Sequence, residues 1–161
     1  MSSNPQIPGL DAERVFPELS GHTRDEVLRD ISQRLAQTGA VRDAEELARH
    51  LIERERLGCT GVGSGIALPH CKLKNLSGIV VAIGRCPEPV DFLAPDGTFI
   101  SLLFLILSPA DAPALHLQAL ARVSRWLKTP GVADRLLRAT TKEEILDVVR
   151  EGQAQPQVVH G

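Results

Sequence analysis

The residues best suited to chemistry lie in one glycine-rich stretch, residues 54–73, which reads R-E-R-L-G-C-T-G-V-G-S-G-I-A-L-P-H-C-K-L. Glycines at this density allow the backbone to approach a ligand closely and to adopt positive φ. Pro69 fixes its own φ and biases Leu68 toward extended geometry, which predicts that His70 stands at the end of a strand. A histidine held beside glycine-rich backbone and nearby cations is suited to accepting a charged group such as phosphoryl.

Phosphoryl acceptance sets clear requirements on His70. The imidazole must be neutral to attack and form a phosphoramidate, and a partner on its other ring nitrogen should fix the tautomer. Phosphoryl transfer depends mainly on positioning and on charge stabilisation, so the site needs donors and cations. Spacing alone leaves this role evenly balanced against a histidine that stands in a turn and has no function.

Two basic residues flank the stretch. Arg54 falls near the end of a predicted helix, where its charge would favour the helix dipole if the side chain is merely solvated. Its planar donor fork is equally suited to stabilising a phosphoryl group. Lys72 is a weaker candidate, because it is either a nearby cation or a surface lysine on a docking face.

His116 is the second histidine of interest. With Leu120, Val123 and Leu127 it follows the spacing i, i+4, i+7 and i+11, which places all four on the inward face of a predicted helix. A buried imidazole must find a hydrogen-bond partner. On this pattern alone, a satisfied core histidine is favoured over a catalytic one.

Other chemistries fit less well. The soft metal ligands that the sequence offers are Cys59, His70, Cys71, Cys86 and His116. The chain has no C-x-x-C and no H-x-x-x-H pair, so a zinc site is disfavoured. Cys71 is open to three readings: a nucleophile served by His116, a redox-sensitive brake, or a small buried residue, of which the last is favoured. The glycines lack both the G-K-[ST] ending of a P-loop and G-x-G-x-x-G spacing, so no nucleotide site is predicted.

Helices and strands are interspersed along the chain, which predicts an α/β fold with helices packed against a sheet. Capping-box spacing predicts a helix from Thr23 to Gly39, and a second from Asp43 to the start of the glycine-rich stretch. A β-branched strand is predicted over residues 78–86, ended by Pro87 and Pro89. The apolar run 98–107 is predicted to be the central strand.

Three further helices are expected in the second half of the chain. The first opens between Ser108 and Pro113, with Ser108 or Asp111 as its cap, and ends at Lys128. A short one follows Thr129-Pro130, and the last opens at Thr141.

Length and composition exclude several classes of function. The chain has 161 residues, of which 43% are hydrophobic and 24% are charged, which is typical of one soluble domain. A net charge of −2 favours neither nucleic acid nor membrane surfaces. There is no apolar run of the roughly 20 residues that a span needs, and the polar N-terminus is not a secretory signal. Three cysteines at irregular spacing are typical of the reducing cytoplasm.

The glycine-rich stretch resembles the enzyme IIA component of the bacterial phosphoenolpyruvate-dependent phosphotransferase system, in the fructose/mannitol/nitrogen-regulatory class. That family carries R-E-x-x-G-[ST]-T-G-[IV]-G-x-G-[IV]-A-[IL]-P-H, which stands here as R-E-R-L-G-C-T-G-V-G-S-G-I-A-L-P-H over residues 54–70. Cys59 replaces the usual Ser or Thr, Ser64 replaces the frequent Asn, and Cys71 follows His70 where Gly is commonest. Cys71 is the departure that would alter access to His70.

The resemblance implies a fold and an activity. It implies an α/β fold in which one mixed sheet carries helices on both faces, over a domain of residues 10–150 between a disordered lead (1–9) and a disordered tail (151–161). His70 would take a phosphoryl group on Nε2 from a small carrier protein of the HPr kind. His116 matches the family's second histidine, which positions the first, and Arg54 would balance the phosphoryl charge. No metal or organic cofactor is implied.

Downstream partners divide the family into branches. Sugar-transporting members pass phosphate to a IIB domain, whereas nitrogen-regulatory members control other proteins through their phosphorylation state. A chain with neither a IIB cysteine signature nor a membrane domain favours the regulatory branch. A protein-interaction module that has lost phosphotransfer is a further alternative, which Cys71 keeps open.

Overall fold

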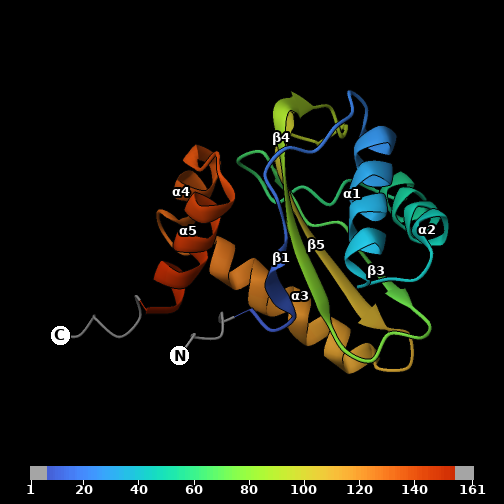
Figure 1. Cartoon of the computed structure of the whole chain (residues 1–161). Helices are drawn as coiled ribbons and strands as arrows, with labels where there is room; N and C mark the ends of the chain where they lie inside the picture. Colours follow the sequence, from blue (N-terminus) through green and yellow to red (C-terminus); the bar gives the residue numbers. More distant parts are fainter. Residues whose placement is uncertain (1–6, 155–161) are drawn as a thin grey trace.

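In the computed structural model of this chain, the backbone is described over residues 7–154 and the side chains over residues 7–151. One mixed sheet forms the centre of the fold (Figure 1). Its strands are β1 (Leu10–Phe16), β2 (Ile66–Ala67), β3 (His70–Leu73), β4 (Val80–Val90) and β5 (Ile100–Pro109). Their order is β1-β4-β5-β2, and β3 also pairs with β5. The β4–β5 pair is antiparallel and the others are parallel, so the expected mixed sheet is confirmed.

Helices cover both faces of the sheet, as expected. On one face lie α1 (Arg24–Thr38) and α2 (Ala44–Arg56), and on the other lie α3 (Pro113–Leu127), α4 (Val132–Arg138) and α5 (Lys142–Ala154) (Figure 1). No helix in the described part of the chain is both long enough and apolar enough to cross a membrane.

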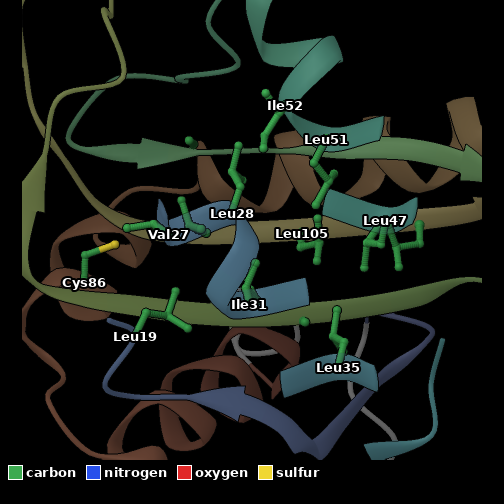
Figure 2. Packing of buried hydrophobic residues seen from close by; sticks show 14 of the residues in the cluster. Leu19, Val27, Leu28, Ile31, Leu35, Leu47, Leu51, Ile52, Cys86 and Leu105 are labelled. Carbon is green, nitrogen blue, oxygen red and sulfur yellow. The ribbon is translucent and has the colours of Figure 1, made fainter. Parts of the chain in front are cut away.

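The central strand β5 divides the core in two. Leu103, Leu105 and Leu107 pack with α1 and α2, where the leucines and isoleucines of both helices meet the sheet (Figure 2). Leu102, Phe104 and Ile106 instead pack with the cluster that includes α3, α4 and α5. Because side chains alternate along a strand, from Leu102 to Leu107 the odd-numbered residues of β5 face one layer of helices and the even-numbered residues face the other. This parity also fixes which face the candidate site occupies.

Local capping explains where the helices begin. The hydroxyl of Thr23 accepts a hydrogen bond from the Glu26 amide at 3.1 Å, and the Asp43 carboxylate accepts one from the Glu46 amide at 3.1 Å. Gly39 ends α1 with a φ of 86°, a left-handed conformation that glycine adopts without strain. The predicted starts of both helices are confirmed.

Two expectations about the later elements are wrong. Strand β4 does not end before Pro87 but continues to Val90, with an irregularity in its pairing to β5 between Arg85 and Val90. This irregular register accommodates prolines that cannot donate to a regular ladder. Ser108 does not cap α3, because it lies inside β5, and the helix begins after Ala112 without a side-chain cap.

The packed chain extends slightly beyond the boundaries expected at residues 10 and 150. Ile7 is buried, and the Gly9 carbonyl accepts a hydrogen bond from the Val81 amide, so β4 already holds this segment. At the other end α5 continues to Ala154. The remainder of the expected lead, residues 1–6, and of the expected tail, residues 155–161, lies outside the described residues.

Candidate functional site

His70 stands at a break in the edge strand of the sheet. The strand expected to end at His70 ends at Ala67, and after Leu68-Pro69 the chain re-forms a strand that His70 opens. Pro69 lacks an amide proton and so cannot donate to the ladder. His70 is paired with Ile106 of β5, an even-numbered position, so its ring lies on the face that α3 covers.

The tautomer of His70 is fixed by its own backbone. Nδ1 lies 2.7 Å from the carbonyl oxygen of Leu68. A carbonyl oxygen can only accept, so Nδ1 carries the proton and donates it. Nε2 is therefore the ring nitrogen with a free lone pair, which is the nitrogen that can attack an electrophile.

The surroundings of His70 keep its ring neutral. Burial lowers its pKa below the ordinary value of 6.5, and the positive charge of Arg54 lowers it further. The bond to Leu68 and the negative charge of Glu55 oppose this shift in part. A lowered pKa increases the fraction of neutral, nucleophilic imidazole at neutral pH.

The structure brings His116 beside His70. The two ring centroids are 5.5 Å apart, with the ring planes inclined at 48°. His116 is 7% exposed and lies in the first turn of α3, and its Nδ1 is 2.7 Å from the hydroxyl oxygen of Ser108. Burial lowers the pKa of His116, as do the charges of His70 and Lys72. The inward orientation predicted for this histidine is confirmed.

The two basic residues approach the histidines from different elements. Arg54 lies in the last turn of α2, and its guanidinium donates to the Gly58 carbonyl at 3.3 Å. Its charge acts on the pKa of His70, so it lies within electrostatic reach of that ring. Lys72 is exposed on β3, opposite Ser108, and shares the face of the sheet that carries His70. Lys72 thus shares the histidines' face of the sheet, whereas Arg54 comes from a helix of the opposite layer.

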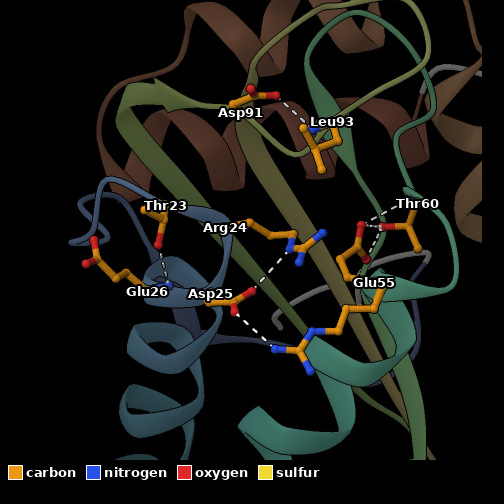
Figure 3. A network of polar contacts seen from close by, with 9 residues as sticks. Thr23, Arg24, Asp25, Glu26, Glu55, Thr60, Asp91 and Leu93 are labelled. Atoms are coloured by element: carbon orange, nitrogen blue, oxygen red, sulfur yellow. Dashed lines mark hydrogen bonds and ion pairs between the residues drawn. The ribbon is translucent and has the colours of Figure 1, made fainter.

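A buried carboxylate, which the sequence analysis did not identify, supports the glycine-rich stretch. Glu55 is 2% exposed, and its carboxylate accepts from the Thr60 amide at 3.0 Å and from the Thr60 hydroxyl at 2.9 Å (Figure 3). The Thr60 carbonyl accepts from the Leu68 amide at 3.0 Å, and the Leu68 carbonyl accepts from His70. A continuous series of hydrogen bonds therefore links the end of α2 to the His70 ring. In the sequence, the only indication of this series was that Glu55 and Thr60 are part of the motif.

The tip of the glycine-rich stretch adopts a backbone that requires small residues. Gly63, Ser64 and Gly65 all have positive φ, at 93°, 60° and 86°. A Cβ on Gly65 would lie 3.2 Å from the carbonyl oxygen of Phe99, so the loop also packs tightly against the start of β5. Asn adopts positive φ more readily than Ser, so the Ser64 departure is a local cost and does not change the fold.

The cysteines and the two histidines of the site lie on opposite faces of the sheet. Cys71 and Cys59 pack against the cluster formed with α1 and α2, and Cys86 is buried within it. His70 and His116 lie on the α3 face, so the soft ligands considered for zinc are not brought together. Within residues 7–151, no three His, Cys, Asp or Glu side chains are grouped to hold a metal ion. The expectation that Cys71 alters access to His70 is wrong, because adjacent strand residues point to opposite faces.

The placement of Cys71 predicts a slow thiol. Burial raises its pKa to about 12, and the negative charge of Glu46 adds to the shift. Because the thiolate is the reactive form, we expect iodoacetamide to alkylate Cys71 far more slowly than a free thiol at neutral pH, as measured by peptide mass spectrometry. Denatured protein is the control, in which alkylation should be fast. Rapid alkylation of Cys71 in the folded protein would restore the thiol-enzyme hypothesis.

The two histidines also predict how stability depends on pH. Their folded-state pKa values lie below the ordinary 6.5, so in acid the unfolded chain binds more protons than the folded protein. The free energy of unfolding is therefore fully maintained above about pH 6.5 and should decrease as pH falls through the folded pKa values. Urea unfolding at a series of pH values on either side of 6.5 measures this slope. The double variant His70→Gln/His116→Gln should show a shallower slope, and an unchanged slope would contradict the assignment.

Comparison with known families gives one match that spans almost the whole described chain. Residues 9–152 match the family model described as "Phosphoenolpyruvate-dependent sugar phosphotransferase system, EIIA 2". This agrees with the resemblance drawn from the glycine-rich stretch.

Individual relatives come from both branches. A nitrogen regulatory protein of Pseudomonas aeruginosa is 36% identical over 144 residues, which cover 89% of this chain and 94% of the relative. The fructose-specific EIIA component of Haloferax volcanii is 42% identical over 113 residues, 70% of this chain and 73% of the relative.

Solved structures share the fold. The nitrogen regulatory protein IIA-Ntr of Neisseria meningitidis superimposes with a TM-score of 0.79 at 26% identity, covering 88% of this chain and 96% of that one. The mannitol IIA enzyme of Escherichia coli, in its complex with phosphorylated IIB, gives a TM-score of 0.70 at 25% identity, with coverage of 88% and 96%.

Proposed function

Because this chain belongs to the EIIA 2 family of the phosphoenolpyruvate-dependent sugar phosphotransferase system, we propose that it carries phosphate on His70. Proteins of this family act as phosphotransferase components. The observation that carries the proposal is the 2.7 Å hydrogen bond from His70 Nδ1 to the Leu68 carbonyl, which leaves the Nε2 lone pair free. The donor is a small phosphocarrier protein of the HPr kind, itself phosphorylated on histidine.

The transfer step needs little from the protein beyond positioning. A P–N bond forms at His70 Nε2 while the P–N bond of the carrier's phosphohistidine breaks, and the leaving nitrogen keeps the electron pair. His70 is already neutral, so no base is required to activate it. Charge on the transferring group is stabilised by nearby donors and cations.

Arg54 and His116 provide that stabilisation. The Arg54 guanidinium is permanently charged, and its fork of donors suits the oxygens of a phosphoryl group. Its bond to the Gly58 carbonyl, at 3.3 Å, holds it at the end of α2. His116 is buried 5.5 Å from His70, ring centre to ring centre, and supplies a ring nitrogen on the same face.

The direct test is the intact mass of the protein after incubation with phosphoenolpyruvate, enzyme I and an HPr-type carrier. We expect one added phosphoryl group that is lost in acid, as phosphoramidates are. The reaction without carrier is the control. No adduct on folded protein with an active carrier would overturn the proposal and favour the protein-interaction module.

The downstream role is proposed to be regulatory, in the cytoplasm. Similarity to nitrogen regulatory proteins over about nine-tenths of the chain supports this branch. Similarity to the fructose-specific EIIA component keeps sugar transport as the alternative, in which a IIB domain would receive the phosphate. Incubating the phosphorylated protein with fructose-type and mannitol-type IIB domains distinguishes them. Rapid loss of phosphate to a IIB domain would establish the transport role.

A further inference from the structure

We propose that Ser108 is a positioning residue that holds His116 in the tautomer with its proton on Nε2, opposite to the tautomer of His70. This inference rests on the proposed function of His70. It makes the two histidines complementary: His70 presents a lone pair on Nε2, and His116 presents an N–H donor to the oxygens of the group that His70 accepts.

Ser108 occupies a place in the sheet from which it can reach only the α3 side. It is an even-numbered residue of β5, completely buried, and paired with Lys72 of β3. The even-numbered residues of β5 before it, Leu102, Phe104 and Ile106, pack in the cluster that includes α3, α4 and α5, so the hydroxyl points toward the first turn of α3. His116 lies in that turn, with its Nδ1 at 2.7 Å from the hydroxyl oxygen.

The direction of this hydrogen bond follows from what else surrounds the hydroxyl. Within the described part of the chain, His116 Nδ1 is the hydrogen-bond partner of the Ser108 hydroxyl. If Nδ1 carried a proton, the hydroxyl would accept it, and its own proton would be buried without an acceptor. A buried donor without an acceptor is unfavourable. The hydroxyl therefore donates, and Nδ1 is the acceptor.

The proton of the neutral His116 ring is then on Nε2. Burial and the charges of His70 and Lys72 lower the pKa of His116, so the ring is mainly neutral at pH 7 and carries one proton. Among the hydrogen bonds of the described residues, none uses Nε2 of His116. This N–H is consequently available as a donor.

The complementarity depends on having two different partners. The Leu68 carbonyl can only accept and so places the His70 proton on Nδ1, whereas the Ser108 hydroxyl can donate and so places the His116 proton on Nε2. If both rings had the His70 tautomer, His116 would direct a lone pair toward the oxygens of a phosphoryl group, which would repel it. A hydroxyl at position 108 prevents this.

The test compares Ser108→Ala with the wild-type protein by two measurements. Nitrogen-15 NMR of the imidazole rings reports the tautomer directly and needs no phosphoryl donor. We expect His116 as Nε2–H in the wild type and a large Nδ1–H fraction in Ser108→Ala. The rate of phosphoryl transfer from the carrier should fall by about tenfold, less than the roughly 100-fold or more typical of removing a transition-state donor outright.

Two further variants control for structural effects. Ser101→Ala makes the same substitution near the opposite end of the same strand and should leave both measurements unchanged. Ser108→Thr keeps the hydroxyl and should keep the Nε2–H tautomer and most of the rate, if the added methyl group is accommodated. Thermal unfolding confirms that each variant is folded.

The outcomes separate this inference from the proposed function. Nδ1–H on His116 in the wild type would overturn it, as would an unchanged tautomer or an unchanged transfer rate in folded Ser108→Ala. If the wild type takes no phosphoryl group and the NMR still shows opposite tautomers controlled by Ser108, the proposed function fails while the positioning of His116 stands.

Discussion

His70→Gln is expected to accept no phosphoryl group from the carrier. Glutamine is close in size to histidine and is also polar, so the local backbone should survive. It has no nucleophilic lone pair equivalent to Nε2, so the P–N bond cannot form. Intact mass after incubation with phosphoenolpyruvate, enzyme I and carrier should show only unmodified protein.

Matched histidine variants make this result specific. His22→Gln changes an exposed histidine whose ring lies beside Glu88 of β4, and this variant should be phosphorylated at the wild-type rate. His116→Ala should still be phosphorylated, but on the order of 100-fold more slowly, because it loses a charge-stabilising donor and retains the nucleophile. A stoichiometric adduct on His70→Gln would show that another residue is the acceptor.

Glu55→Ala is expected to be the most destabilising single change at the site. It removes the acceptor of the Thr60 amide and hydroxyl, and it leaves both donors in a region that is almost completely buried. Hydrogen bonds to charged groups contribute about 1.5–3 kcal/mol each, and a buried donor without a partner costs about 1–3 kcal/mol. We expect a loss of about 2–4 kcal/mol in the free energy of unfolding, a large part of the 5–15 kcal/mol typical of a domain.

The same change should slow phosphoryl transfer. Thr60 is bonded to Leu68, and Leu68 holds the His70 ring, so releasing Thr60 loosens the atoms that fix the tautomer. A decrease of about tenfold is expected at a temperature where the variant is folded, because small misplacements of reacting groups reduce rates strongly. Urea unfolding and single-turnover transfer are the two measurements.

Neighbouring positions provide the controls for Glu55. Glu53→Ala, an exposed site on the same helix, should change stability by less than about 0.5 kcal/mol. Thr60→Val removes the hydroxyl and keeps the amide, so it should have a smaller effect than Glu55→Ala. If Glu55→Ala were as stable as Glu53→Ala, the carboxylate would have no structural role.

Features that depend on local sequence were predictable. Thr23 and Asp43 cap their helices through residues three positions later, and Gly39 ends α1 because glycine adopts positive φ without strain. The break in the edge strand before His70 follows from Pro69, which cannot donate to the ladder. In each case the physical cause lies within a few residues along the chain.

Prolines and serines near element ends were harder to interpret, because their role depends on pairing partners. Pro87 and Pro89 interrupt a regular ladder, yet β4 continues to Val90 because its register to β5 is irregular there. Ser108 has the properties of a helix cap in sequence, but β5 extends through it and points its hydroxyl at His116. Local propensity cannot reveal where a strand in the sheet ends.

By itself, then, the sequence determined that the chain forms an α/β domain, and it predicted His70 as the residue to bear chemistry. Tertiary structure alone decided what surrounds that ring. The parity of β3 turns His70 toward α3 and Cys71 toward α2, and the packing of α3 on β5 brings His116 to 5.5 Å from His70. The same holds for Glu55 and Ser108. Their burial and their hydrogen-bond partners depend on contacts between elements that meet only when the chain folds.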